Sequence, residues 1–251
     1  MENFDGKVVL ITGAGGGLGR ETAFAFGKAG ATLSLADVNA ESLAETVAQL
    51  RSMGCAEPLF AVIDLDTRDA CQQLVSDTVQ RCGGLDVLCN VAGILNVSHM
   101  ANVTEAQWQK IIAVNLSAPF WLCQAAIPHL LERQGNIVNV ASSGAFVGES
   151  YLVPYTATKA GLVQMTKSMA MEFIKTGIRI NAVAPGGMNT PMGNPDAFPK
   201  DLDMELVQQF IPVRPPAEPA MVADLILYVA SDRAANIHGA CLLSDGGHTA
   251  G

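Results

Sequence analysis

A tyrosine and a lysine four positions apart, Tyr155 and Lys159, are the residues whose types and spacing could perform acid/base chemistry. Residues at i and i+4 lie on the same face of a helix, one turn apart. An ammonium group held there favours the charged form of a nearby phenol and so lowers a pKa that normally lies near ~10. The pair therefore predicts a phenol that exchanges a proton near neutral pH. Taken alone the spacing is weak, since Tyr and Lys often share an exposed helical face by chance.

A serine upstream of this pair strengthens the interpretation. Ser142 follows the apolar run 136–141, which has the character of a buried strand. A strand that ends in a serine, then a loop, then a helix that carries Tyr155 and Lys159 could bring the three side chains to one point. The rest of the chain must supply the strands and helices that position them.

The composition predicts a globular protein, because 49% of the 251 residues are hydrophobic and only 16% are charged. The length suits one α/β domain, although length alone would also permit two. The net charge is −9 and there is no Lys/Arg run, so we expect no nucleic-acid partner. The C-terminal apolar stretch 220–230 is too short to span a bilayer, and residues 1–10 do not have the form of a signal peptide. We therefore expect a cytoplasmic protein that does not enter a membrane.

The cysteines and histidines give no sign of a metal site. The six cysteines form no C-x-x-C pair, and several lie in apolar runs, which favours core residues in a reducing compartment over disulfides. The four histidines are scattered along the chain. We expect no bound metal.

A glycine-rich turn near the N-terminus indicates phosphate binding. The apolar run 8–11 predicts a parallel strand buried on both faces, and a helix is predicted over 20–29. Between them lies a T-G-x-x-x-G-x-G spacing whose fixed glycines are Gly13, Gly17 and Gly19. Such glycines let backbone N–H groups approach a pyrophosphate at a helix N-terminus. Glycine-rich turns also occur merely for tight geometry, but this context makes phosphate binding the favoured interpretation.

Acidic residues end the next two predicted strands. Asp37 follows the strand 31–36, where a carboxylate can accept hydrogen bonds from both hydroxyls of an adenosine ribose. It would repel a 2′-phosphate, and neither Gly16 nor Val38 supplies a basic residue to offset that. Asp37 therefore predicts NAD rather than NADP, and a further role as a helix cap is compatible with this. Asp64 could reach the adenine edge, although a simple helix N-cap is nearly as good an interpretation.

Alternating strands and helices continue to the C-terminus and predict one doubly wound parallel α/β sheet. The later predicted strands are 59–63, 85–89, 136–141, 178–184 and 240–244, and the later predicted helices are 40–53, 67–82, 104–132, 152–175 and 218–230. Thr104 and Gln107 have the spacing of a capping box. Inside the predicted helix 104–132, Pro119 has no N–H, so the carbonyl of Asn115 loses its usual hydrogen-bond donor. Either this carbonyl holds a water, or the helix is only kinked here. Residues 190–216 are predicted to form a mobile substrate lid with a short helix, or else an ordinary surface excursion.

In combination these motifs resemble the short-chain dehydrogenase/reductase family, in its compact single-domain branch. The resemblance rests on Thr12 to Gly19, Asp37, Asp64, Asn90 to Gly93, Asn115, Ser142, Tyr155 with Lys159, Pro185 to Thr190 and Asp245-Gly246-Gly247. Val91 stands where the family often has a second Asn, and Ser244 where an apolar residue is usual, but neither departure touches the chemistry. The resemblance implies a single Rossmann-type domain over 1–251, with about seven strands and helices on both faces of the sheet. It also implies a homotetramer in which helices 104–132 and 152–175 form the main dimer contact.

By this resemblance Tyr155 would be the general acid/base, and Ser142 would hydrogen-bond the substrate oxygen. Lys159 would bind the nicotinamide ribose and lower the pKa of Tyr155. Asn115 would position a water in the proton relay. The implied cofactor-binding residues are Gly13, Gly16, Gly17, Leu18, Gly19, Asp37, Asp64, Leu65, Asn90, Ala92, Gly93, Tyr155, Lys159, Pro185, Gly186, Met188 and Thr190.

The expected function is NAD(H)-dependent interconversion of a secondary alcohol and a ketone, by hydride transfer. One alternative is a 3-oxoacyl thioester reductase, which would usually use NADPH, so Asp37 counts against it. Another is a non-catalytic, cofactor-sensing protein on the same fold. Such proteins commonly lose Tyr or Lys, and here both are present. Residues 94–100, 144–154 and 190–216 would determine the substrate, but they carry no readable motif.

Overall fold

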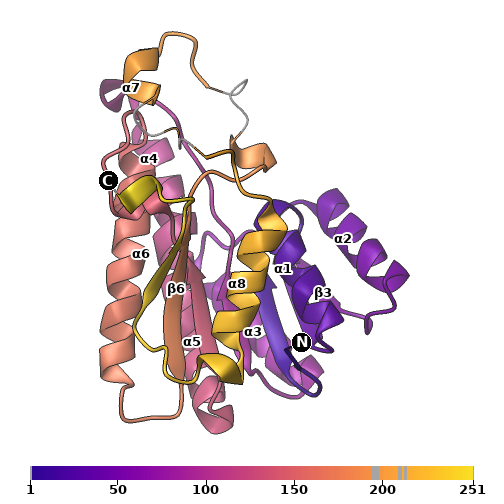
Figure 1. Cartoon of the computed structure of the whole chain (residues 1–251). Coiled ribbons are helices and arrows are strands. Elements are labelled where there is room, and N and C mark those ends of the chain that lie inside the picture. Colours follow the sequence, from indigo (N-terminus) through magenta and orange to yellow (C-terminus); the bar gives the residue numbers. More distant parts are fainter. Residues whose placement is uncertain (1, 194–197, 209–210, 212–213, 251) are drawn as a thin grey trace.

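Seven parallel strands form one sheet at the centre of the molecule (Figure 1). The structure is a computed structural model that describes residues 2–193, 198–208, 211 and 214–250. In sheet order the strands are β3 (Leu59–Val62), β2 (Thr32–Asp37), β1 (Val8–Thr12), β4 (Val87–Asn90), β5 (Asn136–Val140), β6 (Arg179–Pro185) and β7 (Cys241–Ser244). Neighbouring strands pair in parallel throughout. The predicted doubly wound α/β sheet is confirmed.

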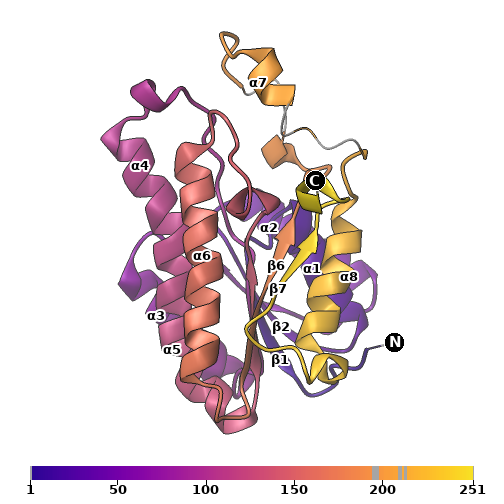
Figure 2. The same cartoon turned by 60° about the vertical axis from the view of Figure 1, so that its left-hand side comes forward.

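Helices cover both faces of this sheet, as Figure 2 shows. One face carries α1 (Gly17–Lys28), α2 (Ala40–Ser52) and α8 (Pro219–Ala230). The other carries α3 (Arg68–Cys82), α4 (Glu105–Ile112), α5 (Ala118–Arg133) and α6 (Val153–Glu172). Because the sheet is covered on both sides, strands β1 and β5 are buried along their whole length, as their uninterrupted apolar runs predict.

The helix predicted over 104–132 forms with one local change in its winding. Thr104 and Gln107 make the predicted capping box at its start. A π-helical turn, Ala113–Ser117, then separates α4 from α5, so the chain keeps a helical course from Glu105 to Arg133. A widened turn of this kind accommodates Pro119, which cannot donate to the carbonyl of Asn115. The sequence left a kink or a water-binding carbonyl open, and the π-helical turn is the form that the backbone takes.

By length and composition, this composite helix of 29 residues is apolar enough to cross a bilayer. In the fold it packs against α3 and the sheet, with 44% of its most apolar window buried. Core helices of globular proteins have the same properties. Its apolar residues are therefore accounted for in part by the core on that face of the sheet.

The segment 190–216 leaves the sheet after β6 and contains the short helix α7 (Met204–Gln208), as expected. Residues 194–197, 209–210 and 212–213 of the predicted lid lie outside the described residues. Polar contacts of Asp201 and Asp203, among the described residues, connect the segment to the loops beside it. The backbone N–H of Asp203 donates to the hydroxyl of Tyr151 at 3.0 Å, and a carboxylate oxygen of Asp201 lies 3.4 Å from His99 Nε2. Whether the segment moves as a lid stays a prediction.

Close packing in the β1–α1 turn gives a stability prediction. A Cβ atom at Gly19 would overlap the carbonyl oxygen of Gly13, whereas one at Gly16 would meet nothing within 4 Å. Gly19→Ala should therefore lower the free energy of unfolding by about 3 kcal/mol, or the Tm by about 6–12 °C, while Gly16→Ala changes it by less than about 1 kcal/mol. Thermal unfolding of the two variants beside the parent chain measures this. Equal losses from both substitutions would contradict this packing of the turn.

Candidate active site

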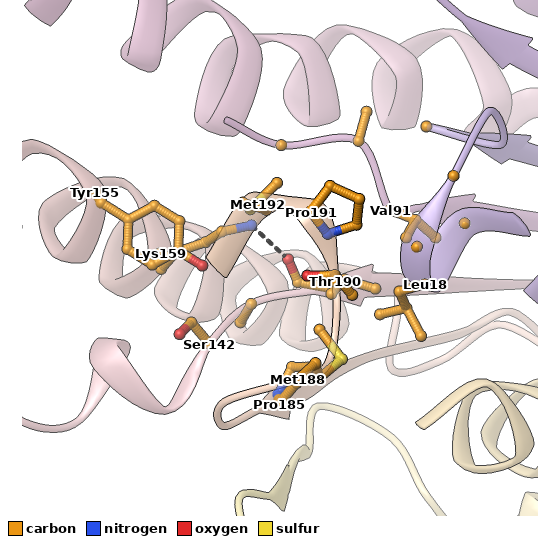
Figure 3. A pocket seen from close by; sticks show the side chains of 18 of the residues that line it. Leu18, Val91, Ser142, Tyr155, Lys159, Pro185, Met188, Thr190, Pro191 and Met192 are labelled. Carbon is orange, nitrogen blue, oxygen red and sulfur yellow. Dashed lines mark hydrogen bonds between the residues drawn. The ribbon is translucent and has the colours of Figure 1, made fainter. Parts of the chain in front are cut away.

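A cleft opens at the carboxyl ends of the central strands, where open parallel sheets bind their ligands. Its larger part, about 290 Å³, extends from the β1–α1 turn to Ser142, Tyr155 and Lys159. Its smaller part, about 220 Å³, continues past Asp37 to the end of β3. The two parts share Gly13, Asp37, Ala92 and Gly93. Figure 3 shows Ser142, Tyr155 and Lys159 on one side of the larger part and Leu18 and Val91 across from them.

The glycine turn brings backbone close to backbone at the floor of the cleft. Gly13 has φ +70°, and a Cβ atom there would lie 2.8 Å from Cα of Ala92, so only glycine suits the position. Thr12 supports the same junction, because its hydroxyl accepts from the N–H groups of Val91 and Ala92, each at 3.1 Å. Among the described residues, no side chain caps the start of α1. Its first N–H groups therefore suit an anion, as the sequence predicts.

Asp37 lies at the end of β2, where both parts of the cleft meet. One carboxylate oxygen accepts from the N–H of Gly15 at 2.8 Å, and the other accepts from the N–H of Asn39 at 2.8 Å. These bonds hold the negative charge beside the glycine turn. The arrangement fits the sequence prediction for a ribose-binding carboxylate, and the residues of the cradle suit a dinucleotide.

Arg20 is a basic residue near this position that sequence reasoning missed. Its guanidinium donates to the carbonyl of Gly15 at 2.6 Å and pairs with Glu45 at 2.9 Å. It also donates to the Thr46 hydroxyl and to the carbonyl of Ser42. These bonds use Nε and Nη2 of Arg20, and the two N–H groups of Nη1 have no described partner.

Asp64 and Leu65 line the smaller part of the cleft, as expected for an adenine-binding edge. The alternative that Asp64 caps the next helix is wrong, because Thr67 caps α3 through a bond from the N–H of Ala70. Asp64 instead pairs with Lys110 at 2.8 Å, and this bond raises the pKa of the Lys110 ammonium. Lys110 comes from α4, so no local pattern in the sequence could reveal the pair.

Asn90 does not reach the cleft with its side chain. Its amide is buried at 2% exposure and donates to Asn139 Oδ1 at 2.8 Å. Asn139 in turn donates to Thr166 of α6 at 2.9 Å. The Asn90 side chain therefore links β4, β5 and α6 inside the core, and the predicted cofactor contact at this residue stays a prediction. The neighbouring Ala92 and Gly93 do line the cleft.

Asn115 connects the π-helical turn to the loop after β4. Its side chain exchanges two hydrogen bonds with the backbone of Ile94, at 2.8 and 2.9 Å, and donates to Thr158 of α6 at 3.3 Å. The residue is fully buried. These bonds hold the turn that contains the Asn115 carbonyl against the loop after β4. The water that the sequence predicts at this carbonyl stays a prediction.

Residues after β6 form the remaining wall of the cleft. Pro185, Gly186, Met188 and Thr190 all line its larger part, as predicted. Thr190 lies directly against the glycine turn, since a Cβ atom at Gly17 would be 3.3 Å from its methyl group. Sequence reasoning missed five other residues that line this part, namely Val91, Val140, Ala141, Pro191 and Met192.

Ser142, Tyr155 and Lys159 come together on the side of the cleft formed by β5 and α6. Lys159 is 3% exposed, and its Nζ atom donates to the carbonyl of Val140 at 2.8 Å (Figure 3). The same Nζ lies 5.7 Å from the centre of the Tyr155 ring. Burial lowers the pKa of the Lys159 ammonium to about 8. The convergence that the sequence predicts is therefore present in the fold.

The direction of the Tyr155 pKa is opposite to the one predicted. Burial of the half-buried Tyr155 raises its pKa, a hydrogen bond with Ser142 acts to lower it, and the Glu149 carboxylate raises it further. The net direction in this arrangement is thus upward, and a lowering of the Tyr155 pKa by Lys159 stays a prediction. Desolvation of the phenolate outweighs the effect of the lysine, whose own charged form is disfavoured by burial.

The buried ammonium gives a second stability prediction. A lysine whose pKa falls on folding binds fewer protons when folded, so stability rises as pH increases from about 8 towards 10.5. Lys159→Met should therefore raise the free energy of unfolding of the NAD-free protein by roughly 1–3 kcal/mol at pH 7, and by less at pH 10. Lys167→Met, on the exposed face of α6, serves as the control and should change little. Denaturant titrations measure this. If Lys159→Met were less stable than the parent protein at pH 7 while the control was unchanged, the buried charge of Lys159 would not be costly to the fold.

Comparison with known proteins identifies the family. The family model described as short chain dehydrogenase matches residues 7–198. The 3-oxoacyl-[acyl-carrier-protein] reductase of Thermotoga maritima is 36% identical, over 97% of this chain and 98% of its own. The D-threitol dehydrogenase of Mycolicibacterium smegmatis is also 36% identical, over 98% of this chain and 94% of its own.

A solved structure agrees with these relatives. The short chain dehydrogenase from Mycobacterium paratuberculosis, crystallised with NAD bound, superposes with a TM-score of 0.92 at 26% identity. The match covers 99% of this chain and all of that one. With these matches over nearly its whole length, the chain belongs to the short-chain dehydrogenase family and is an oxidoreductase of that family.

Proposed function

We propose that this chain is an NAD(H)-dependent oxidoreductase that interconverts a secondary alcohol and the matching ketone, with Tyr155 as its proton-transfer group. The observation that carries the proposal is the convergence of Ser142, Tyr155 and Lys159 on the cleft that the glycine turn also lines. A phosphate-binding turn and a proton-transfer group at one cleft suit a redox reaction of a carbinol. Relatives whose names denote alcohol dehydrogenases, such as the D-threitol dehydrogenase, support this reaction class.

Each residue has a distinct part in the proposed reaction. When bound, NAD supplies the hydride acceptor for alcohol oxidation. Ser142 orients the substrate oxygen, and Tyr155 takes its proton or returns it in the reverse direction. Lys159 would hold the nicotinamide ribose, and the carbonyl of Asn115 would hold the relay water. Because burial raises the pKa of Tyr155, the phenol is protonated at neutral pH and is ready to act as the acid in ketone reduction.

The choice of NAD rests on Asp37. Its carboxylate is fixed beside the glycine turn by the N–H of Gly15, and Arg20, the basic residue near it, forms an ion pair with Glu45. The NAD-bound structural relative also favours this cofactor. Similarity to a 3-oxoacyl reductase keeps thioester reduction as the second candidate function, but a preference for NADP would require the charge of Asp37 to be offset. A non-catalytic cofactor sensor is the third candidate function, and the presence of both Tyr155 and Lys159 counts against it.

The proposal also covers the assembly and setting of the chain. We propose a single domain over 1–251 that forms a cytoplasmic homotetramer, with 190–216 closing over the substrate. Trp108 of α4 and Phe120 of α5 are 39% and 41% exposed, which suits a helix face that is buried between subunits. Sedimentation velocity at micromolar concentration distinguishes a tetramer from a monomer.

Cofactor preference is the first functional prediction. The wild-type kcat/KM should favour NAD over NADP by ~10²-fold or more, because a 2′-phosphate would face the Asp37 carboxylate. Asp37→Ala should reduce the preference to within about tenfold. Asp69→Ala, which removes an exposed charge from α3, should leave the preference unchanged. Equal use of both cofactors by the wild type would rule out the assignment.

The proton-transfer role of Tyr155 gives the second functional prediction. Tyr155→Phe keeps the ring and loses the hydroxyl, so NAD affinity should persist while kcat falls by roughly 10²- to 10⁴-fold. Ser142→Ala should also reduce kcat with NAD binding nearly intact. In the wild type, alcohol oxidation should increase with pH into the alkaline range, because the raised pKa of Tyr155 delays formation of the phenolate. Retention of most activity by Tyr155→Phe on a confirmed substrate would eliminate this mechanism.

A further inference from the structure

Glu149 lies in the loop between β5 and α6, which carries Ser142 at its start. Its carboxylate packs directly on Gly144, because a Cβ atom at that position would be only 2.7 Å from Oε2 of Glu149. Gly144 in turn donates its N–H to the hydroxyl of Ser142 at 3.2 Å. The carboxylate is therefore held next to the residue proposed to orient the substrate oxygen. A side chain at position 144 would displace this carboxylate from its place.

The charge of the same carboxylate also acts on the phenol of Tyr155, whose pKa it helps to raise. Glu149 itself is half-buried, and this burial raises the pKa of its carboxyl to about 7. Within the part of the chain that the structure describes, no ion pair or hydrogen bond reaches its carboxylate oxygens. A carboxylate desolvated without such partners is costly to the fold. Neither the cofactor cradle nor the proton transfer gives it a role.

We propose that Glu149 is a specificity residue that accepts a hydrogen bond from a second donor group on the substrate, near the carbinol held by Ser142 and Tyr155. This role rests on the proposed alcohol oxidation. A hydroxyl or an ammonium group on a neighbouring carbon would provide the missing donor, so the substrate class is a diol, a polyol or an amino alcohol. A substrate with a carboxylate at that place would be repelled. Simple alcohols of the same size would lack the contact.

The experiment compares wild type, Glu149→Gln and Glu149→Leu on a matched set of substrates with NAD. The set is 2-butanol, the stereoisomers of 2,3-butanediol, 3-amino-2-butanol and 3-hydroxybutyrate. Glu172→Leu, at an exposed site near the end of α6, is the control for loss of one carboxylate. Thermal unfolding and NAD affinity are measured for every variant. If Glu149→Leu does not fold, Glu149→Gln carries the comparison through 3-hydroxybutyrate, on which its activity should rise.

Glu149→Leu should lower the ratio of kcat/KM for diol over 2-butanol by about tenfold or more, the usual effect of losing a hydrogen bond to a charged group. Glu149→Gln should retain much of the activity on the diol, because its amide oxygen still accepts a hydrogen bond. It should lose activity on the amino alcohol if the ammonium is the natural donor. Activity on 3-hydroxybutyrate should rise in both variants. Glu172→Leu should leave every ratio unchanged.

Two outcomes would overturn the inference in distinguishable ways. Oxidation of alcohols and diols with a ratio that neither variant changes would remove Glu149 from substrate recognition and leave the proposed function intact. Binding of NAD by a wild type that oxidises no member of the set would count against both the inference and the proposed function.

Discussion

The burial of one ammonium group, that of Lys159, is the constraint around which the site is built. At 3% exposure, its charge has a single described hydrogen-bond acceptor, the carbonyl of Val140. The lowering of its pKa from 10.5 to about 8 corresponds to about 3 kcal/mol of destabilisation of the charged form. The bond to the end of β5 also sets the position of α6 against the sheet, and with it the place of Tyr155 one turn earlier. Chemistry at this site thus depends on a group that costs stability.

The order of the strands then determines what lies opposite this group. The chain builds outward from β1 in one direction through β2 and β3, and in the other through β4 to β7, so the crevice forms where β1 and β4 adjoin. Close approach of Gly13 to Ala92 brings the glycine turn to that crevice. The cleft continues past Asp37 to the end of β3 on one side, and the loop after β6 lines its other side. A long, narrow ligand with phosphates in its middle suits such a cleft, and the proton-transfer residues lie at its far end.

Patterns that act over short distances in the chain were readable from the sequence. Uninterrupted apolar runs predicted the strands, and the spacing of Tyr155 and Lys159 predicted their shared helix face. What could not be read depends on contacts between distant segments. The Asp64–Lys110 and Arg20–Glu45 pairs join elements far apart in sequence, and the turn of Asn90 into the core depends on its partner in β5. The pKa of Tyr155 was misjudged for the same reason, since burial is a property of the whole fold.

The ionisation of Tyr155 in the NAD-free protein tests most directly whether burial governs the site. The chain has only three tyrosines, so NMR titration with ¹³C-labelled tyrosine, compared with a Tyr155→Phe sample, isolates this phenol. If desolvation dominates, the pKa of Tyr155 should lie above the ordinary value of ~10. A pKa well below that value would show instead that the charge of Lys159 prevails over desolvation, and it would contradict the central role of burial at this site.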